Sequence, residues 1–318
     1  MEDWRPGTTR AALEARGVLF AKIREFFAQR DVLEVDTPVL ARFGVTDPSI
    51  EPLRLMPSQA DPSTLFLQSS PEFAMKRLLA AGSGPIYQLG KAFRDGEIGG
   101  RHNPEFTLLE WYRPGFSLEQ LVSEVAELVC ECLSMSQWEV MRYHTLFQDT
   151  LGVDPWELTA IELQRVAAEH LDTGSIDLDY DGWLDLLMSH VVEPTLVDRG
   201  IVVLCDYPPS QAALARCTDR HGRRVAERFE VYVGGIELAN GYRELLDAEE
   251  LRERSAADNA RRHAAGQESR ELDSRLVAAM ETGLPDCSGV ALGVDRLLMA
   301  QLGADNLSAV MPFDWTRN

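Results

Sequence analysis

A Gly-Gly pair at residues 234–235 constrains the fold of this 318-residue chain more than any other feature. It separates two strand-like segments, and two glycines in this position are typical of a two-residue turn between antiparallel strands. Such a turn predicts that Tyr232 lies opposite Glu237 in the hairpin. Because side chains alternate along a strand, Glu230 would share a face with Glu237, roughly 7–8 Å from it.

Two carboxylates on one face repel each other unless a cation lies between them. A hard divalent cation prefers oxygen ligands, so Glu230 and Glu237 are candidate ligands. An exposed sheet face would produce the same pattern, and the spacing alone leaves both interpretations open. Glu244 lies beyond the Asn240-Gly241 break, where it is available to a separate amine.

A charged, glycine-containing loop at residues 95–104 forms a second candidate site. The segments on both sides of it, 85–94 and 105–112, have the composition of strands. Long charged hairpin loops are uncommon unless they have a function. Arg94, at the end of the first strand, could hold a phosphate or a carboxylate through two guanidinium nitrogens. A solvated loop would explain the composition equally well.

A third candidate site lies near the C-terminus, where glycines interrupt an apolar strand at residues 288–293. A helix follows and contains Arg296 near its start. Glycine permits close approach of a ligand to the backbone, and the arginine adds to the positive end of the helix dipole. This combination suits a polyphosphate, although a loose glycine pattern can also be purely structural.

The other segments indicate a mixture of helices and strands. Ser70 and Pro71 are typical of a helix start, with Pro71 at the first helical position. The pattern predicts helices at residues 9–30 and 117–133 and after Ser70, strands at 32–38, 65–67 and 201–205, a loop at 44–61, and several short helices within 138–190.

Charge and composition exclude several classes of protein. The chain has 31 Lys and Arg against 51 Asp and Glu, a net charge of −20, which opposes a broad nucleic-acid-binding face. No apolar run approaches the about 20 residues of a membrane-spanning helix, so no membrane contact is expected. There is no secretory signal, and five scattered cysteines indicate no disulfide framework. We therefore expect a reducing, cytoplasmic location.

Taken in order, these clusters resemble the three signature motifs of class II aminoacyl-tRNA synthetases. Residues 30–40, which include Thr37-Pro38, resemble motif 1, residues 93–106 resemble motif 2, and residues 289–296 resemble motif 3. The resemblance extends over nearly the whole chain. It implies an α+β fold, in which helices flank a mainly antiparallel sheet.

Two longer sequence segments narrow the resemblance to the lysyl branch, namely His102-Asn103-Pro104-Glu105-Phe106 and residues 235–241. Residues 69–79, 109–114 and 285–293 are similar to free-standing paralogues of lysyl-tRNA synthetase that act on elongation factor P. The segment before motif 1 has no room for an anticodon-binding barrel, so we expect residues 1–318 to form a single catalytic domain.

The resemblance implies an ATP- and Mg²⁺-dependent ligase. It would activate lysine or (R)-β-lysine as an adenylate and transfer it to a lysine of elongation factor P. We expect a homodimer through motif 1 and no tRNA partner. The alternative is a lysine-activating enzyme that serves a tRNA or another acceptor.

The resemblance also implies the residues of the site. Arg94 and Arg296 would be the catalytic residues. The nucleotide would be bound by Arg94, Asp95, Gly96, Asn103, Phe106, Glu237, Leu238, Gly293 and Arg296, the metal by Glu230 and Glu237, and the amino acid by Ser70, Pro71, Glu72, Tyr112, Glu244 and Ala291.

Two positions depart from the pattern of lysyl-tRNA synthetases. Gly96 stands where motif 2 usually has a glutamate, and Glu97 follows it. Ala291 replaces a glycine of motif 3. We hypothesise that its methyl group reshapes the pocket floor in favour of a β-amino acid.

Overall fold

The computed structural model describes residues 4–56 and 63–318. Contacts divide the chain into two compact units, Met1–Ser117 with Glu244–Asn318, and Leu118–Arg243. The predicted Gly-Gly hairpin belongs to the second unit, whereas Arg94 and Arg296 belong to the first.

The first unit is built on four strands, which lie in the order β1 (Leu33–Glu34), β5 (Ile86–Phe93), β6 (Glu105–Pro114) and β12 (Cys287–Gly293). β1 pairs in parallel with β5, and the other two pairs are antiparallel. Gln88 is paired with Glu110, which is paired with Ala291. These three residues therefore form one row across the sheet.

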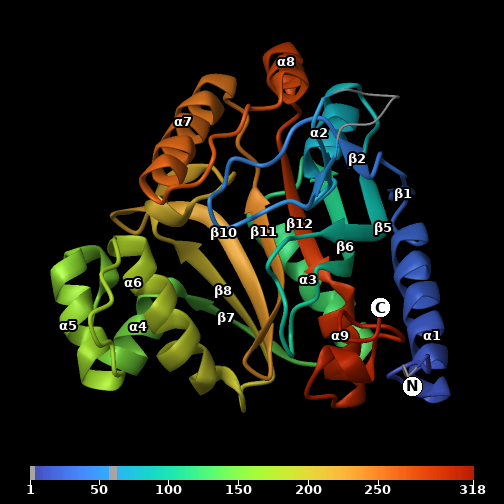
Figure 1. Ribbon diagram of the computed structural model, residues 1–318, viewed down its shortest axis with the longest axis horizontal. Helices are drawn as coiled ribbons and strands as arrows, with labels where there is room; N and C mark the ends of the chain where they lie inside the picture. Colours follow the sequence, from blue (N-terminus) through green and yellow to red (C-terminus); the bar gives the residue numbers. More distant parts are fainter. Residues whose placement is uncertain (1–3, 57–62) are drawn as a thin grey trace. The chain divides into compact units, whose positions relative to one another are not determined.

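Helices surround this sheet and a small second sheet in the order β2, β4, β3 (Figure 1). Phe27 anchors the first helix, since its ring stacks on Tyr87 at 4.4 Å. Leu13 and Val18 of this helix are 41% and 60% exposed, although both are apolar. The elements are α1 (Arg10–Ala28), α2 (Glu72–Ala80), α7 (Ala248–Ala264), α8 (Ser274–Gly283), α9 (Val294–Leu302), η5 (Leu307–Ala309), β2 (Leu40–Ala41), β3 (Arg54–Leu55) and β4 (Leu65–Leu67).

The second unit has its own strands, in the order β11, β10, β8, β7, with β9 paired to β10. The helices α4, α5 and α6 gather beside β7 and β8 (Figure 1). Their core is mostly aliphatic and also contains the aromatic side chains of Tyr143, Phe147, Trp183 and Tyr207. The elements are α3 (Leu118–Leu133), β7 (Trp138–Arg142), α4 (Tyr143–Leu151), η1 (Pro155–Glu157), α5 (Ala160–His170), α6 (Tyr180–Leu187), η2 (Met188–Val192), η3 (Glu193–Leu196), β8 (Ile201–Tyr207), η4 (Pro209–Gln211), β9 (Cys217–Arg220), β10 (Arg223–Val233) and β11 (Ile236–Arg243).

The α+β fold and the antiparallel hairpin are confirmed, with Tyr232 opposite Glu237. A bulge at Leu238, which the sequence did not reveal, then places Asn240 opposite Glu230. No helix among the described residues is long and apolar enough to cross a membrane.

Two segments contain a strand that the sequence pattern did not indicate. Residues 138–190 form the several short helices that were predicted, but the segment begins with β7, which pairs in parallel with β8. The expected loop at 44–61 contains β3, which pairs with β4, and its residues 57–62 lie outside the described part. In both cases the strand is stabilised by a partner elsewhere in the chain, so local pattern did not reveal it.

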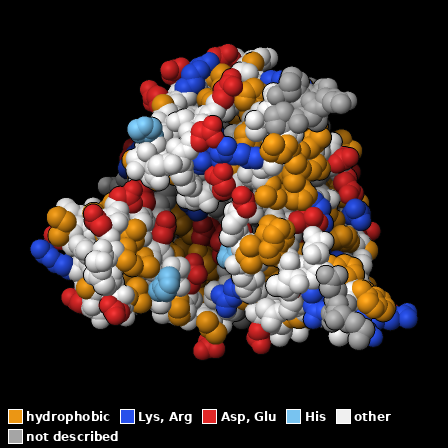
Figure 2. Space-filling model, viewed as in Figure 1, with side chains coloured by type: hydrophobic (Ala, Val, Ile, Leu, Met, Phe, Trp, Pro, Cys, Tyr) orange, Lys and Arg blue, Asp and Glu red, His pale blue; other side chains and the backbone are white. Residues whose placement is uncertain are grey.

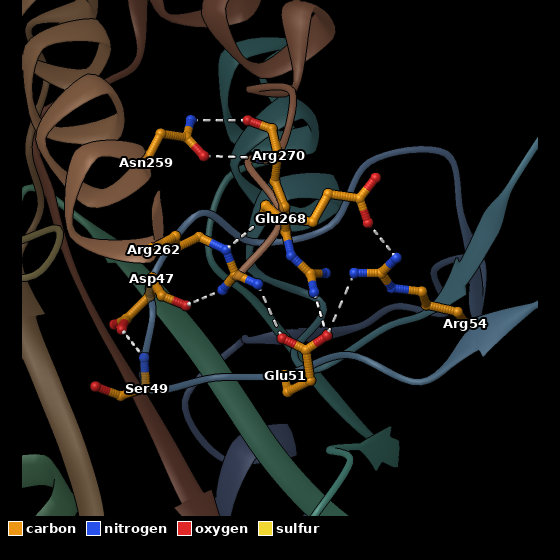
Figure 3. A network of polar contacts seen from close by, with 8 residues as sticks. All are labelled: Asp47, Ser49, Glu51, Arg54, Asn259, Arg262, Glu268 and Arg270. Atoms are coloured by element: carbon orange, nitrogen blue, oxygen red, sulfur yellow. Dashed lines mark hydrogen bonds and ion pairs between the residues drawn. The ribbon is translucent and has the colours of Figure 1, made fainter. Parts of the chain in front are cut away.

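A polar network fixes the segment after β2 to α7 and to the residues that follow α7 (Figure 3). Glu51 forms ion pairs with Arg262, at 3.0 Å, and with Arg270. The two arginine side chains are only 1% and 3% exposed. The carbonyl of Glu51 also accepts a hydrogen bond from the backbone of Asp95, at 2.6 Å. The network therefore supports the loop of motif 2.

We predict that Glu51→Ala destabilises the protein by about 3 kcal/mol, because it leaves two buried guanidinium groups without their carboxylate. Urea unfolding measures the loss. Glu14→Ala is the control, since Glu14 pairs with Arg10 on the exposed surface and should change the midpoint little. Equal effects of the two substitutions would contradict the prediction.

Candidate active site

The floor of a polar pocket is formed by β6 and β12. Glu110 and Tyr112 alternate along β6 and lie opposite Ala291 and Gly289 of β12. A Cβ atom at Gly289 would lie 2.3 Å from the Tyr112 ring and 2.5 Å from Glu244 Oε1. Only glycine therefore leaves room for these two side chains.

The start of α2 forms one wall of this pocket. Ser70 Oγ accepts a hydrogen bond from the backbone of Glu72, at 3.0 Å, and donates one to Glu110 Oε2, at 2.7 Å. The Tyr112 hydroxyl donates to the other oxygen of Glu110, at 2.7 Å. Pro71 stands just before the first helical residue, one position earlier than predicted. The structure thus brings together the predicted residues Ser70, Glu72 and Tyr112.

Lys76 lies at the centre of this cluster. Its Nζ donates to Glu72 Oε1 at 2.6 Å and lies 2.6 Å from Glu244 Oε2. The Lys76 side chain is 3% exposed, and that of Glu244 is 1% exposed. Glu244 is positioned by its backbone N–H, which donates to the carbonyl of Cys287 at 3.0 Å.

Three residues of this pocket, namely Lys76, Glu110 and Gly289, were not predicted from the sequence. The spacing of Glu72 and Lys76 is the i,i+4 spacing of a helical ion pair, and this signal could have identified Lys76. Nothing local marks Glu110, because its partners lie on other elements.

Burial shifts the protonation of the pocket. Burial and the charge of Glu72 raise the pKa of Glu110 to about 8. Burial also raises the pKa of Glu244 to about 7, although Lys76 opposes this shift. For Lys76, burial lowers the pKa, but the charges of Glu244 and Glu72 outweigh it and raise the pKa overall. Tyr112 stays neutral, since burial and nearby carboxylates raise its pKa well above the ordinary value.

Arg94 lies next to this pocket, at the end of β5. Its Nε donates to the carbonyl of Ser69 at 3.4 Å, and its guanidinium lies 5.2 Å from the centre of the Phe106 ring. Glu97 lies 3.5 Å from Arg94, so this glutamate contacts the motif 2 arginine directly. Gly96 has a φ of +76°, a left-handed conformation that a glutamate in its place would rarely adopt.

Arg296 joins motif 3 to the motif 2 loop. It follows Gly293, the residue at the end of β12, and its Nε donates to the carbonyl of Arg101 at 3.2 Å. A second nitrogen lies 2.7 Å from His102 Nε2. Burial, together with the charge of Arg296, lowers the pKa of His102, so the ring is neutral near pH 7.

Asn103 has a structural role in this loop. Its amide nitrogen donates to the carbonyl of Glu105 at 2.6 Å. Its side-chain oxygen accepts from the backbone of Trp315 at 2.8 Å. Both ends of the amide therefore hold the loop, and a nucleotide contact would have to share them.

The predicted metal ligands belong to the second unit. Glu230 is buried and accepts hydrogen bonds from Tyr207 at 2.6 Å and Tyr232 at 2.5 Å. It also forms an ion pair with Arg228 at 2.5 Å. Glu237 lies opposite Tyr232 on β11.

Two carboxylates are too few for a metal site made of protein alone. The described residues contain no group of three or more His, Cys, Asp or Glu side chains that could hold a metal ion. Mg²⁺, however, is usually held by one or two carboxylates together with substrate phosphates. A Mg²⁺ ion that bound with a nucleotide would have to share Glu230 with Tyr207, Tyr232 and Arg228.

The comparison with known proteins identifies the family. The family model described as "tRNA synthetases class II (D, K and N)" matches residues 2–317. The chain belongs to the class II tRNA synthetases. The match covers nearly all of both units and confirms the family that the three motifs predicted.

Curated relatives that align over nearly their whole length are identical to this chain at almost half of the aligned positions. The elongation factor P–(R)-β-lysine ligases of Haemophilus influenzae (strain PittGG) and Pasteurella multocida (strain Pm70) are 44% and 45% identical to it, over 98% of this chain and 98% and 97% of their own. The ligase of Yersinia pestis (strain Pestoides F) is 47% identical over 98% of this chain and 97% of its own.

We predict that Gly289→Ala abolishes the binding of lysine, because the added Cβ overlaps the Tyr112 ring and Glu244. Overpacking should cost only about 1–3 kcal/mol of stability, so the variant can be purified and its affinity measured by calorimetry. Gly17→Ala is the control, since a Cβ there meets no atom within 4 Å. Wild-type affinity in Gly289→Ala would show that the pocket lies elsewhere.

Proposed function

We propose that this protein activates (R)-β-lysine with ATP and joins it to the ε-amino group of a lysine on elongation factor P. The observation that carries the proposal is the cluster of three carboxyl groups, those of Glu72, Glu110 and Glu244, of which the last two are buried. Buried carboxylates need cationic partners, and a diamine supplies two. The names of the full-length relatives support the acceptor and the isomer.

Glu72 and Glu244 hold the two amines of the substrate in this proposal. Tyr112 and Ser70 fix the carboxylate of Glu110 through their hydroxyl groups, so the acceptor oxygens are positioned before the substrate binds. This preorganisation lowers the cost of ordering a flexible aliphatic substrate.

Arg94 is next to the pocket and holds the substrate carboxylate and the α-phosphate of ATP. Phe106 stacks on the adenine, and Arg296 holds the terminal phosphates. Asp95, Gly96, Asn103, Leu238 and Gly293 complete the nucleotide site. Two fixed cations stabilise the negative charge that develops at phosphorus.

The reaction then takes two steps. A carboxylate oxygen attacks the α-phosphate, which forms the aminoacyl-adenylate and releases pyrophosphate. The lysine ε-amine of elongation factor P next attacks the activated carbonyl, loses a proton and releases AMP. Mg²⁺, held by Glu230 and Glu237, would neutralise phosphate charge, while the protein contributes mainly through positioning and electrostatics.

Several features support a protein acceptor rather than tRNA. The net charge of −20 opposes binding of a phosphate backbone. The two units together would act as one catalytic domain. All five cysteines are free thiols, which suits a reducing cytoplasm.

Motif 1 supports a homodimer. Leu33, Val39 and Leu40 are large apolar side chains with exposed fractions of 58%, 39% and 55%. Hydrophobic side chains gather over the region of β2 (Figure 2). Contiguous exposed apolar residues are typical of a subunit interface.

Mass spectrometry of elongation factor P tests the proposed function. After incubation with the protein, ATP and (R)-β-lysine, one acceptor lysine should gain the mass of one lysyl group. Arg94→Ala should reduce the rate by about 100-fold or more, because it removes a cation from the transition state. No mass gain with either isomer, together with aminoacylation of a tRNA, would favour the alternative acceptor.

Ala291→Gly tests the preference for the β-isomer. Ala291 is the neighbour of Glu110 across the pocket floor. Removing its methyl group should shift adenylate formation toward α-lysine by about tenfold, since one methyl-sized contact is worth about 1–3 kcal/mol. An unchanged ratio of kcat/KM for the two isomers in pyrophosphate exchange would refute this role.

A further inference from the structure

Lys76 is a cation that the proposed reaction does not use, yet it lies inside the amino-acid pocket. Its Nζ is 2.6 Å from Glu72 and 2.6 Å from Glu244. The ammonium is withdrawn from water, because the side chain is 3% exposed. A lysine so placed is fixed, and it cannot serve as a mobile nucleophile without leaving the carboxylates of Glu72 and Glu244 unpaired.

We propose that Lys76 is a positioning residue that sets the charge of the pocket, so that the pocket selects substrates with two amines. Glu72, Glu110 and Glu244 supply three carboxylates when all are ionised, and Lys76 cancels one of them. Once the substrate has displaced the protons that Glu110 and Glu244 hold near pH 7, the remaining two negative charges match the two ammonium groups of a diamine. This inference rests on the proposed function in one respect, namely that the substrate carries two amines.

Among the described residues, Lys76 is the cation paired with carboxylates of this cluster, whereas Arg94, next to the pocket, donates to the carbonyl of Ser69. The groups that face the cluster are Glu72 from α2, Glu110 and Tyr112 from β6, and Glu244 before α7. The strand β12 contributes Gly289 and Ala291, which have no charge. Tyr112 remains neutral, because its pKa lies well above the ordinary value. Lys76 is therefore the one cation among these groups.

Without Lys76, the carboxylates should bind protons rather than the substrate. Buried carboxyl groups that lose a counter-ion become neutral, since desolvation disfavours the charged form. A diamine must then displace those protons, so its apparent affinity at pH 7 falls. The loss should be smaller at high pH, where the carboxyl groups ionise again.

Lys76→Met tests the inference through the affinity for lysine and (R)-β-lysine, measured by calorimetry between pH 6 and pH 9. The dissociation constant at pH 7 should rise by about tenfold or more. At a pH below the carboxyl pKa, raising that pKa by one unit makes the ionised carboxylate about tenfold rarer, and only the ionised form binds an ammonium group. The pH at which affinity is half-maximal should also move upward. Arg77→Met is the control, because Arg77 is the next residue of α2 and is exposed.

A double variant separates charge from folding. Lys76→Met with Glu72→Gln removes one positive and one negative charge, which restores the balance of the pocket. Its pH profile should return toward that of the wild type, even though one contact to the substrate is lost. ATP affinity, measured on the same samples, reports whether each variant is folded.

Three outcomes would overturn the inference. They are an unchanged pH profile in a folded Lys76→Met, a profile that stays shifted in the double variant, and a wild-type protein that binds neither isomer. Failure of the proposed function would give a different result. Lysine would then bind with the predicted pH profile, but elongation factor P would gain no mass.

Discussion

The pairing of one buried ammonium with two carboxylates, beside the buried carboxyl group of Glu110, is the constraint on which this protein's site depends. Charges are costly to remove from water unless they are paired and hydrogen-bonded. Lys76 pairs with Glu72 and Glu244, while Ser70 and Tyr112 satisfy Glu110. The rest of the pocket follows from this requirement, including the glycine on β12 that makes room for Tyr112 and Glu244.

The two arginines of the proposed nucleotide site are held by a different kind of contact. Arg94 and Arg296 donate hydrogen bonds to backbone carbonyls of Ser69 and Arg101, so backbone atoms position both cations. The loop that carries motif 2 is fixed in turn by Asn103 and by the carbonyl of Glu51. Cations held in this way need little reorganisation when phosphate charge develops, which is the main source of electrostatic catalysis.

The sequence predicted those features that depend on neighbours along the chain. The Gly-Gly turn predicted the pairing of Tyr232 with Glu237, and the motifs predicted the family. Features that depend on distant partners were not predicted. The bulge at Leu238 and the strand β7 arise from packing within the sheet, and Glu110 becomes a pocket residue only when α2 and β6 come together.

Proton release on lysine binding tests most directly whether the pocket is built for a diamine. Calorimetric titrations at pH 7 in buffers of different ionisation enthalpy count the protons that leave the protein. Because the pKa values of Glu110 and Glu244 are raised to about 8 and about 7, lysine should release protons, whereas norleucine, which lacks the second amine, should release fewer. Lysine binding without proton release, or equal release by both amino acids, would contradict a pocket of buried carboxylates that binds two amines.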